Sequence, residues 1–253
     1  MTNQLDRLLS IMALLRDPDK GCEWDLAQDF SSIAPYTIEE AYEVADAIER
    51  SDFENLKSEL GDLLLQIVFH ARIAEEAGHF AFHDIAKSIS DKIERRHPHI
   101  FEAQSGVMNE ARWEDLKEAE RRSEGSTGAL DGVALALPAL MRAQKLQKRA
   151  SRQGFDWPDA DGPKAKVIEE LRELEEATEK DRAEEAGDLL FAAVNLVRAY
   201  GVDAEQALRD ANSKFQRRFE AMENMADGKF AQLNLDKQER LWNEVKKQEN
   251  SDL

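Results

Sequence analysis

Cysteine is almost missing from this chain, because Cys22 is the only one among 253 residues. No disulfide can form within the chain, which favours a reducing compartment, so we expect a cytoplasmic protein. Glycine and proline are scarce, at 12 and 6 residues, and aromatic residues make up 7%. This scarcity, together with the abundance of Ala, Leu, Glu and Lys, favours helices over sheets.

Long hydrophobic runs are also missing. No apolar segment approaches the roughly 18 residues that a membrane-spanning helix needs. Residues 8–15 (LLSIMALL) have about the length of a signal-peptide core, but no basic leader precedes them and no small-residue cleavage site follows. We therefore interpret this segment as the buried face of a helix, and we expect no membrane partner.

Basic charge is in short supply as well. The chain has 34 Lys and Arg residues against 52 Asp and Glu residues, which gives a formal net charge of −18. Such a chain should repel nucleic acid polymers and anionic membranes. A small phosphate ligand can still bind if metal ions bridge it to the protein, so the charge argues against a polymer-binding role but does not exclude a nucleotide site.

The most informative feature that is present is an internal repeat. Four blocks occur in the same order in both halves, at offsets of 130, 126, 122 and 129 residues. They are TIEEAYEVADA (37–47) with VIEELRELEEA (167–177), SELGDLLLQIV (58–68) with EEAGDLLFAAV (184–194), KIERR (92–96) with KFQRR (214–218), and RWEDLK (112–117) with LWNEVK (241–246). Four ordered matches indicate a duplication.

The duplication predicts an all-α protein built from tandem helical bundles. We expect four or five helices and no sheet in each half, with domains at 1–122 and 138–253. The segment between them, 123–137, begins with the Gly- and Ser-rich stretch SEGSTGALDG and is interpreted as a linker. Helices are expected over about 3–16 and 138–152, with Pro138 in the first turn of the second one.

Apolar residues at helical spacing predict the core-facing sides of the repeated helices. Each half has one such stripe, and each half also has a Gly-containing turn with a Trp/Asp pair at 24–25 or 156–157. The two stripes consist of Leu56, Leu60, Leu63, Leu64 and Ile67, and of Leu189, Leu190, Ala193, Val194 and Val197.

Acidic residues recur in the matched blocks in a pattern that suggests a site. In each half two carboxylates three residues apart, on one helical face, are followed at a distance by a second such pair. The sets are Glu40, Glu43, Glu59 and Asp62 in the first half and Glu170, Glu173, Glu185 and Asp188 in the second. If the two helices pack antiparallel, these pairs face each other.

Carboxylates beside an apolar stripe need a physical reason, because like charges repel and each loses hydration. A divalent cation would remove this cost. Oxygen ligands without His or Cys suit a hard ion, so we predict Mg²⁺, with Mn²⁺ as a possible substitute. Solvated surface glutamates are the alternative, and the repetition of both pairs favours the metal site.

Basic and aromatic residues in the later blocks would complete a nucleotide site. Arg and Lys suit phosphate charge, and an indole can stack on a base. The predicted nucleotide-binding set is Lys166, Glu169, Arg182, Lys214, Arg217, Arg218, Trp242 and Lys246. The alternative is an ordinary salt-bridged helix surface with tryptophan as partial core.

These stretches resemble the MazG family of nucleoside triphosphate pyrophosphohydrolases over nearly the whole chain. The most specific are GCEWDLAQDF (21–30), PYTIEEAYEVADAI (35–48), SELGDLLLQIVFHARIA (58–74), ERRHPHIF (94–101) and EEAGDLLFAAVNL (184–196). The family pattern EExxE followed by ExxD occurs twice here. The resemblance implies four-helix cores completed by dimerisation, hence a homodimer. It also implies Mg²⁺-dependent hydrolysis of ribo- and deoxyribonucleoside triphosphates to monophosphate and pyrophosphate.

The resemblance also implies roles for individual residues. Glu170, Glu173, Glu185 and Asp188 would be the metal ligands and catalytic residues, and Lys214, Arg218 and Trp242 would bind the nucleotide, with Lys246 close by. The second half is expected to be catalytic and the first structural or regulatory. Both acidic sets are complete, however, so a second possible site comprises Glu40, Glu43, Glu59, Asp62, Lys92, Arg96, Trp113 and Lys117.

Three departures from the family pattern bear on this division of roles. Glu23 stands where the family often has Pro, and Asp29-Phe30 stand where it often has Thr-His. Both weaken a catalytic role for the first half. The gap between Glu173 and Glu185 is shorter than that between Glu43 and Glu59, which predicts a tight helix connection in the second half.

The mechanism expected is metal-assisted hydrolysis, with water attacking the α-phosphorus. One rival is a di-iron bundle, because Glu76 and His79, and Glu94 and His97, form Glu-x-x-His motifs. These motifs do not recur in the second half. The other rival is a non-catalytic helical regulator that binds nucleotide.

Overall fold

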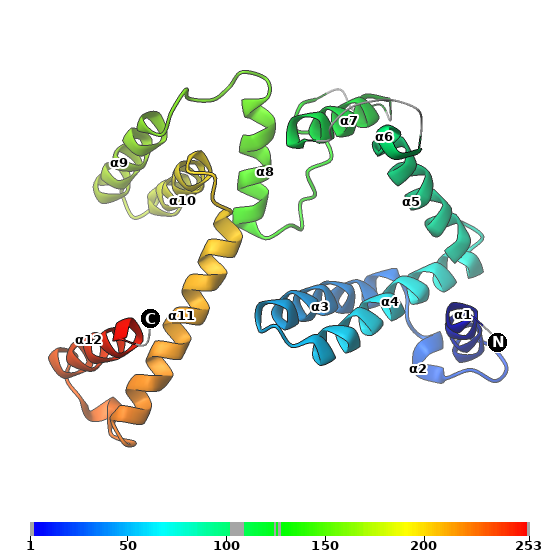
Figure 1. The fold of residues 1–253 in the computed structure, drawn as a ribbon, viewed down its shortest axis with the longest axis horizontal. Helices are drawn as coiled ribbons and strands as arrows, with labels where there is room; N and C mark the ends of the chain where they lie inside the picture. Colours follow the sequence, from blue (N-terminus) through cyan, green and yellow to red (C-terminus); the bar gives the residue numbers. More distant parts are fainter. Residues whose placement is uncertain (1–2, 102–108, 124, 126–127, 252–253) are drawn as a thin grey trace. The chain divides into compact units, whose positions relative to one another are not determined.

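The structure, a computed structural model, describes residues 3–101, 109–123, 125 and 128–251. Every regular element in these ranges is a helix (Figure 1), so the predicted all-α class is confirmed. None of the helices described here is both long enough and apolar enough to cross a membrane. The chain divides into two compact units, Met1–Ala119 and Glu120–Leu253.

The first unit is organised around one helical hairpin. Its helices are α1 (Gln4–Leu15), α2 (Glu23–Leu26), α3 (Phe30–Glu49), α4 (Phe53–Glu76), α5 (Phe82–Arg96), α6 (Pro98–Phe101) and most of α7 (Glu110–Ser123). Helices α3 and α4 form the hairpin, which turns at Ser51 with a φ of 56°. Helix α1 packs on α4, and Met12, Ile33, Val68, Phe69 and Ile73 form the buried core between these helices.

The second unit repeats this hairpin and adds a longer arm. Its helices are α8 (Ala139–Ser151), α9 (Asp161–Glu176), α10 (Arg182–Ala199), α11 (Ala204–Met225) and α12 (Leu235–Ser251), with a short 3₁₀ turn η1 (Phe230–Gln232). Helices α9 and α10 form the hairpin, and α8 packs on α10. Helix α12 folds back along α11 (Figure 1).

The helices predicted over 3–16 and 138–152 are confirmed as α1 and α8 within a residue at each end. Pro138 itself is the N-cap of α8, with a ψ of 139°, and so lies just before the first turn. Its fixed φ and missing N–H suit that boundary equally well. Cys22 is a free, exposed cysteine.

The prediction of a tight connection in the second half is wrong. Helices α9 and α10 are joined by residues 177–181, whereas α3 and α4 are joined by residues 50–52. The shorter spacing between Glu173 and Glu185 arises because α9 ends sooner after Glu173 and α10 begins closer to Glu185. The helices of the second hairpin therefore extend less far beyond their acidic residues, and the carboxylates of the two helices still face each other.

The apolar stripes are only partly covered within one chain. Leu60, Leu64 and Ile67 on α4 are 50%, 37% and 37% exposed, and Leu190 on α10 is 60% exposed. These residues were expected to face the core, and in the single chain they face outward. The buried side of α4 instead carries Val68 and Phe69.

Candidate metal and nucleotide site

The α9–α10 hairpin brings the predicted carboxylates of the second half together. Single carboxylate oxygens of Glu170, Glu185 and Asp188 lie within 4.8 Å of one another, and those of Glu169, Glu170 and Glu173 do so as well. Three-residue spacing places each pair on one helical face, and antiparallel packing makes the faces meet. Glu170 belongs to both groups and is therefore their centre.

The electrostatics of this cluster are those of crowded carboxylates. Glu170 is only 4% exposed, and its Oε2 atom has no hydrogen-bond partner among the described residues. Loss of hydration, followed by the nearby Glu173, Asp188 and Glu170, raises the pKa of Glu185 above its usual value. Ionised carboxylates this close are destabilising without a cation.

One lysine partly neutralises the cluster. The Nζ atom of Lys166 lies 2.5 Å from Glu170 and 2.8 Å from Glu169. The hydrogen bond from Lys166 lowers the pKa of the Glu169 carboxyl, and the same contacts raise the pKa of the lysine. Lys166 therefore stays charged beside the acidic face, where phosphate groups would also lie.

The first half has a similar acidic cluster without that lysine. Oxygens of Glu40, Glu59 and Asp62 lie within 4.8 Å of one another. Burial and neighbouring carboxylates raise the pKa of Glu40 and of Glu59, and Glu59 also hydrogen-bonds Glu43. At the repeat offset of 130 residues, Tyr36 stands where the second half has Lys166.

The other predicted nucleotide-binding residues lie on the α11–α12 hairpin. The guanidinium of Arg218 lies 5.5 Å from the centroid of the Trp242 ring and binds Glu249 at 2.7 Å, while Arg217 lies 3.5 Å from Glu249. Phe215 contacts the same indole, with ring centroids 5.7 Å apart. Lys214 and Lys246 are exposed.

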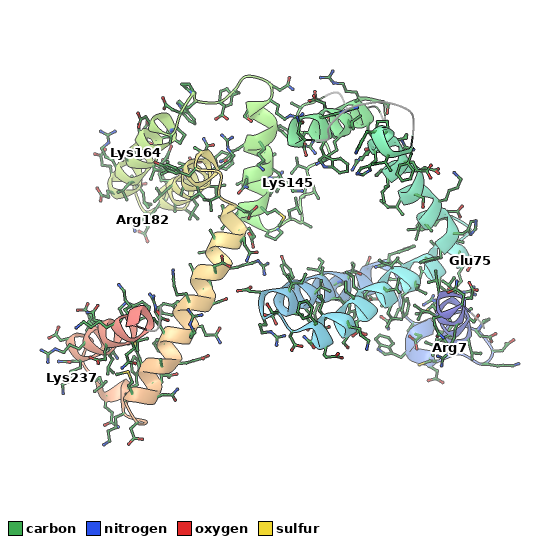
Figure 2. All side chains as sticks on the ribbon, viewed as in Figure 1. Arg7, Glu75, Lys145, Lys164, Arg182 and Lys237 are labelled. Carbon is green, nitrogen blue, oxygen red and sulfur yellow. The ribbon has the colours of Figure 1, made fainter. Side chains whose placement is uncertain are left out.

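Arg217, Arg218 and Trp242 have their contacts on this hairpin, and among the described residues none of these contacts is with the carboxylates of the α9–α10 hairpin. Helix α11 begins beside α10, and α12 packs on the part of α11 that lies farther along that helix (Figure 1). Arg182 is different, because it begins α10, where Figure 2 labels it, one turn before Glu185. The predicted set is thus divided between the acidic hairpin and the basic arm.

The first half repeats the basic and aromatic pairing. Arg96 lies 5.3 Å from the Trp113 ring centroid, and the His97 ring lies 5.3 Å from the same indole. Lys117 binds Glu114 at 2.5 Å, and Lys92 lies one turn before Arg96 on α5. The arginine–tryptophan contact is therefore a feature of both copies, and in both it covers a face of the indole.

A cavity that the sequence reasoning did not predict adjoins the second cluster. It has a volume of about 480 Å³ and lies between α8, α9, α10 and the segment that joins α8 to α9. Its wall includes three aromatic residues, Phe155, Trp157 and Phe191, and its edge includes Lys166, Glu170 and Asp188. The cavity therefore opens on the acidic face.

The Glu-x-x-His motifs do not form a metal site. Glu76 binds Arg16 and Arg72, each at 2.8 Å. His97 contacts the carbonyl oxygen of Ile93 at 2.8 Å through Nδ1 and packs against Trp113. The acidic clusters found in the described part of the chain contain no histidine, so a di-iron bundle lacks its ligands.

Comparison with known proteins agrees with this geometry. A family model, the MazG nucleotide pyrophosphohydrolase domain, matches residues 28–101 and 162–222, which include both acidic hairpins. The chain is 51% identical to a nucleoside triphosphate pyrophosphohydrolase of Escherichia coli, over 98% of each chain. It is 43% identical to the nucleoside triphosphate pyrophosphohydrolase/pyrophosphatase MazG of Thermotoga maritima, over 95% of each chain.

Proposed function

Because the chain belongs to the MazG nucleotide pyrophosphohydrolase family, we propose that it hydrolyses ribo- and deoxyribonucleoside triphosphates to monophosphate and pyrophosphate with Mg²⁺. The observation that supports this most directly is the meeting of Glu170, Glu185 and Asp188 within 4.8 Å, beside Lys166. Facing carboxylates with an adjacent cation suit a ligand that combines metal ions and phosphates.

The residues present fit a hard divalent cation. The donor set contains only carboxylate oxygens, and the buried Oε2 of Glu170 has no partner among the described residues. Loss of hydration, followed by the neighbouring carboxylates, raises the pKa of Glu185. Glu170, Glu173, Glu185 and Asp188 would hold Mg²⁺. When bound, the ion would neutralise charge on the phosphates and on the carboxylates.

The chain's own residues supply the remaining steps. Lys166 binds the polyphosphate and offsets its charge, because its ammonium group already lies at the acidic face. A carboxylate of the cluster accepts a proton from the attacking water, whose oxygen forms a bond to the α-phosphorus. The bond from the α-phosphorus to the bridging oxygen breaks, and pyrophosphate leaves with that oxygen.

The two halves would have different roles, with the second catalytic and the first structural. Both have an acidic cluster, so the carboxylates do not separate them. The difference that supports the assignment is Lys166, whose counterpart Tyr36 carries no positive charge. The first cluster would bind metal and polyphosphate less well.

The protein would act as a homodimer. The exposed Leu60, Leu64 and Leu190 form apolar surface on the two acidic hairpins, and covering it by a second copy would be favourable. Within the described part of the second unit, no contact joins Arg218 or Trp242 of the basic arm, α11–α12, to the carboxylates of the α9–α10 hairpin. In a dimer the arm would be available to a nucleotide held by the other copy.

Product analysis tests the bond choice. ATP and dGTP are incubated with the protein and Mg²⁺ in ¹⁸O-water, and the products are separated and weighed by mass spectrometry. We expect monophosphate that carries ¹⁸O, together with unlabelled pyrophosphate, and no reaction in EDTA. Diphosphate and orthophosphate as the primary products would overturn the proposal.

A further inference from the structure

A carboxylate occupies the two arginines of the basic arm, α11–α12. Glu249 lies in the last turn of α12 and contacts both arginines that are predicted to bind phosphate. Its Oε2 atom lies 2.7 Å from Nη2 of Arg218 and accepts a hydrogen bond from Nε of the same guanidinium at 2.7 Å. Its Oε1 atom lies 3.5 Å from Nε of Arg217. The carboxylate therefore bridges the two guanidinium groups.

The geometry of this contact is one that a phosphate group would also adopt. A guanidinium binds carboxylates and phosphates through the same planar fork of N–H donors. Arg218 presents one edge of its fork, Nε and Nη2, to a single oxygen of Glu249. A phosphate oxygen at this edge would need the same two donors. The carboxylate and a phosphate therefore compete for Arg218.

The arm gathers positive charge around Glu249. Lys214 precedes Arg218 by four residues on α11, and Lys246 precedes Glu249 by three residues on α12, so each lysine shares a helical face with the residue that it precedes. Both lysines are exposed. Together with Arg217 they surround one carboxylate with four cations, in a chain whose formal net charge is −18. Such a local excess of positive charge attracts a polyphosphate.

The ion pair contributes little to the fold. The side chain of Arg217 is 66% exposed and that of Glu249 is 29% exposed, and ion pairs so close to solvent stabilise a protein only weakly. The buried residue of α12 is Val245, at 4% exposure, and burial of apolar side chains holds a helix in place. Helix α12 can therefore stay on α11 when Glu249 leaves the arginines.

The two partners of the ion pair differ in how firmly they are held. Arg218 is 17% exposed, and its guanidinium lies 5.5 Å from the centroid of the Trp242 ring. Glu249 lies in the last turn of its helix, where the carbonyl groups lack partners within the helix and local opening costs least. The hydrogen bond from Arg218 lowers the pKa of the Glu249 carboxyl, so the group is charged at neutral pH. An arriving anion would therefore repel the carboxylate and leave the arginine in place.

We propose that Glu249 is an internal phosphate mimic, which occupies Arg217 and Arg218 in the free protein and is displaced when the polyphosphate of a nucleoside triphosphate binds the arm. The last turn of α12 opens as the carboxylate leaves. Every ligand of the arm has to displace Glu249, and the triphosphate, which carries the most charge, does so best. The products are held more weakly, which favours their release. The inference rests on the proposed function for the identity of the ligand as a polyphosphate.

A carboxylate that held the arginines ready for phosphate would have the opposite effect on binding. Removal of a competitor strengthens the binding of a polyphosphate, whereas removal of a positioning group weakens it. The sign of the change in affinity therefore separates the two roles of Glu249.

The test removes the charge of Glu249 and keeps the size of its side chain. Glu249→Gln is compared with Glu244→Gln, which changes the net charge by the same one unit at an exposed position of α12. Titration calorimetry in EDTA at low salt measures the binding of inorganic tripolyphosphate, because without metal the acidic hairpin repels a polyphosphate and the arm does not. KM for ATP with Mg²⁺ and the melting temperature are measured on the same proteins.

We expect Glu249→Gln to bind tripolyphosphate about tenfold more tightly than wild type and to lower KM for ATP several-fold, with a melting temperature close to that of wild type. Glu244→Gln should match wild type in affinity and in KM. Equal or weaker binding by Glu249→Gln would overturn the proposal. An equal gain in both variants would do so as well, because net charge would then explain it.

A double-variant cycle assigns the gain to the arginine contact. Arg218→Gln is compared with Arg218→Gln/Glu249→Gln in the same calorimetric assay. Without Arg218, most of the gain from Glu249→Gln should disappear, because the carboxylate no longer blocks its main partner. A gain of full size in the absence of Arg218 would contradict the proposed competition.

Hydrogen exchange on wild-type protein keeps the test open if Glu249→Gln fails to fold. We expect the amides of the last turn of α12 to exchange faster with tripolyphosphate bound, and equal or slower exchange would overturn the displacement. None of these binding measurements depends on turnover. Tighter binding by Glu249→Gln in a protein that releases no pyrophosphate from ATP would refute the proposed function and leave the role of Glu249 standing. Release of pyrophosphate without the gain in Glu249→Gln would refute only the role of Glu249.

Discussion

Lys166 is the residue that most clearly separates the two acidic clusters. It contacts Glu169 and Glu170 within 2.8 Å, whereas Tyr36 occupies the matching position of the first half. A lysine held beside carboxylates stabilises them in the free protein and can turn to phosphate when metal takes its place. The same carboxylates can therefore have different consequences in the two halves.

Removing single carboxylates should reveal this asymmetry. We expect Asp188→Ala and Glu173→Ala to lower kcat by about a hundredfold or more, because each removes a ligand that acts in the transition state. The matching changes Asp62→Ala and Glu43→Ala should cost little activity. Turnover and melting temperature are measured for all four variants. If the first-half variants lose as much turnover while they melt like wild type, both halves are catalytic.

The raised pKa of Glu185 leads to a prediction about stability. A glutamate whose folded pKa exceeds 4.5 favours the folded state while it is protonated, and that contribution is lost as the pH rises through the raised pKa. Without metal, the ionised cluster should therefore destabilise the protein at neutral pH. Mg²⁺ should reverse this by binding the ionised form.

Melting curves in EDTA and in Mg²⁺ check this sign. At neutral pH we expect Mg²⁺ to raise Tm, and near pH 4.5, the ordinary glutamate value, the rise should shrink because the ligands take up protons. Glu185→Gln should melt higher than wild type in EDTA at neutral pH and gain less from Mg²⁺. A variant that melts lower than wild type in EDTA would contradict the repulsion argument.

At the scale of elements, the non-helical segment between α8 and α9 is fixed to α9 and α10. The pair between Asp156 and Arg198 anchors it on α10, and the hydrogen bond from Arg198 lowers the pKa of Asp156. Because Gly162 has no side chain, the Trp157 indole can lie against the first turns of α9.

Gly162→Ala should displace that indole, since the new Cβ would lie 2.0 Å from Trp157 Cδ1. We expect KM for nucleoside triphosphates to rise while Mn²⁺ binding stays as in wild type. Gly61→Ala is the control, because no atom lies within 4 Å of its added Cβ, and alanine favours a helix by about 0.5–1 kcal/mol. A Gly162→Ala protein with unchanged KM would show that the position of Trp157 does not matter.

At the scale of the whole molecule, the exposed apolar stripes bear on assembly. Leu190 is 60% exposed and Leu60 is 50% exposed although both lie on helices that carry acidic clusters. Large apolar side chains gathered on one helical face usually mark an interface. The proposed dimer would cover them and enlarge the small core of each unit.

Sedimentation measures this directly. We expect wild-type protein to sediment as a dimer at micromolar concentration, and Leu190→Glu to shift it toward monomer because a charge would be buried at the interface. Lys145→Gln, at an exposed position whose label in Figure 2 lies on α8, changes the net charge by the same one unit and serves as the control. A wild type that stays monomeric across the micromolar range would rule out the dimer.

The sequence alone was sufficient to predict the helices and the acidic residues that share a helical face. Helical periodicity gave the all-α class and the bounds of α1 and α8, and three-residue spacing placed Glu170 on one face with Glu173, and Glu185 with Asp188. Oxygen-only ligands indicated a hard cation. These properties follow from a few neighbouring residues, and because of the internal repeat the same acidic pattern occurs in both halves.

The tertiary structure alone decided what depends on helices far apart in the sequence. It placed Trp242 and Arg218 on an arm, α11–α12, apart from the carboxylates of the α9–α10 hairpin in the same unit, and it turned Leu60 and Leu190 outward. It also formed the cavity lined by Gln147. Whether the side chains of a hairpin fill a core or leave a pocket is decided only when a third helix packs over them. The spacing of residues along one helix does not specify which side chains of other helices will face that helix.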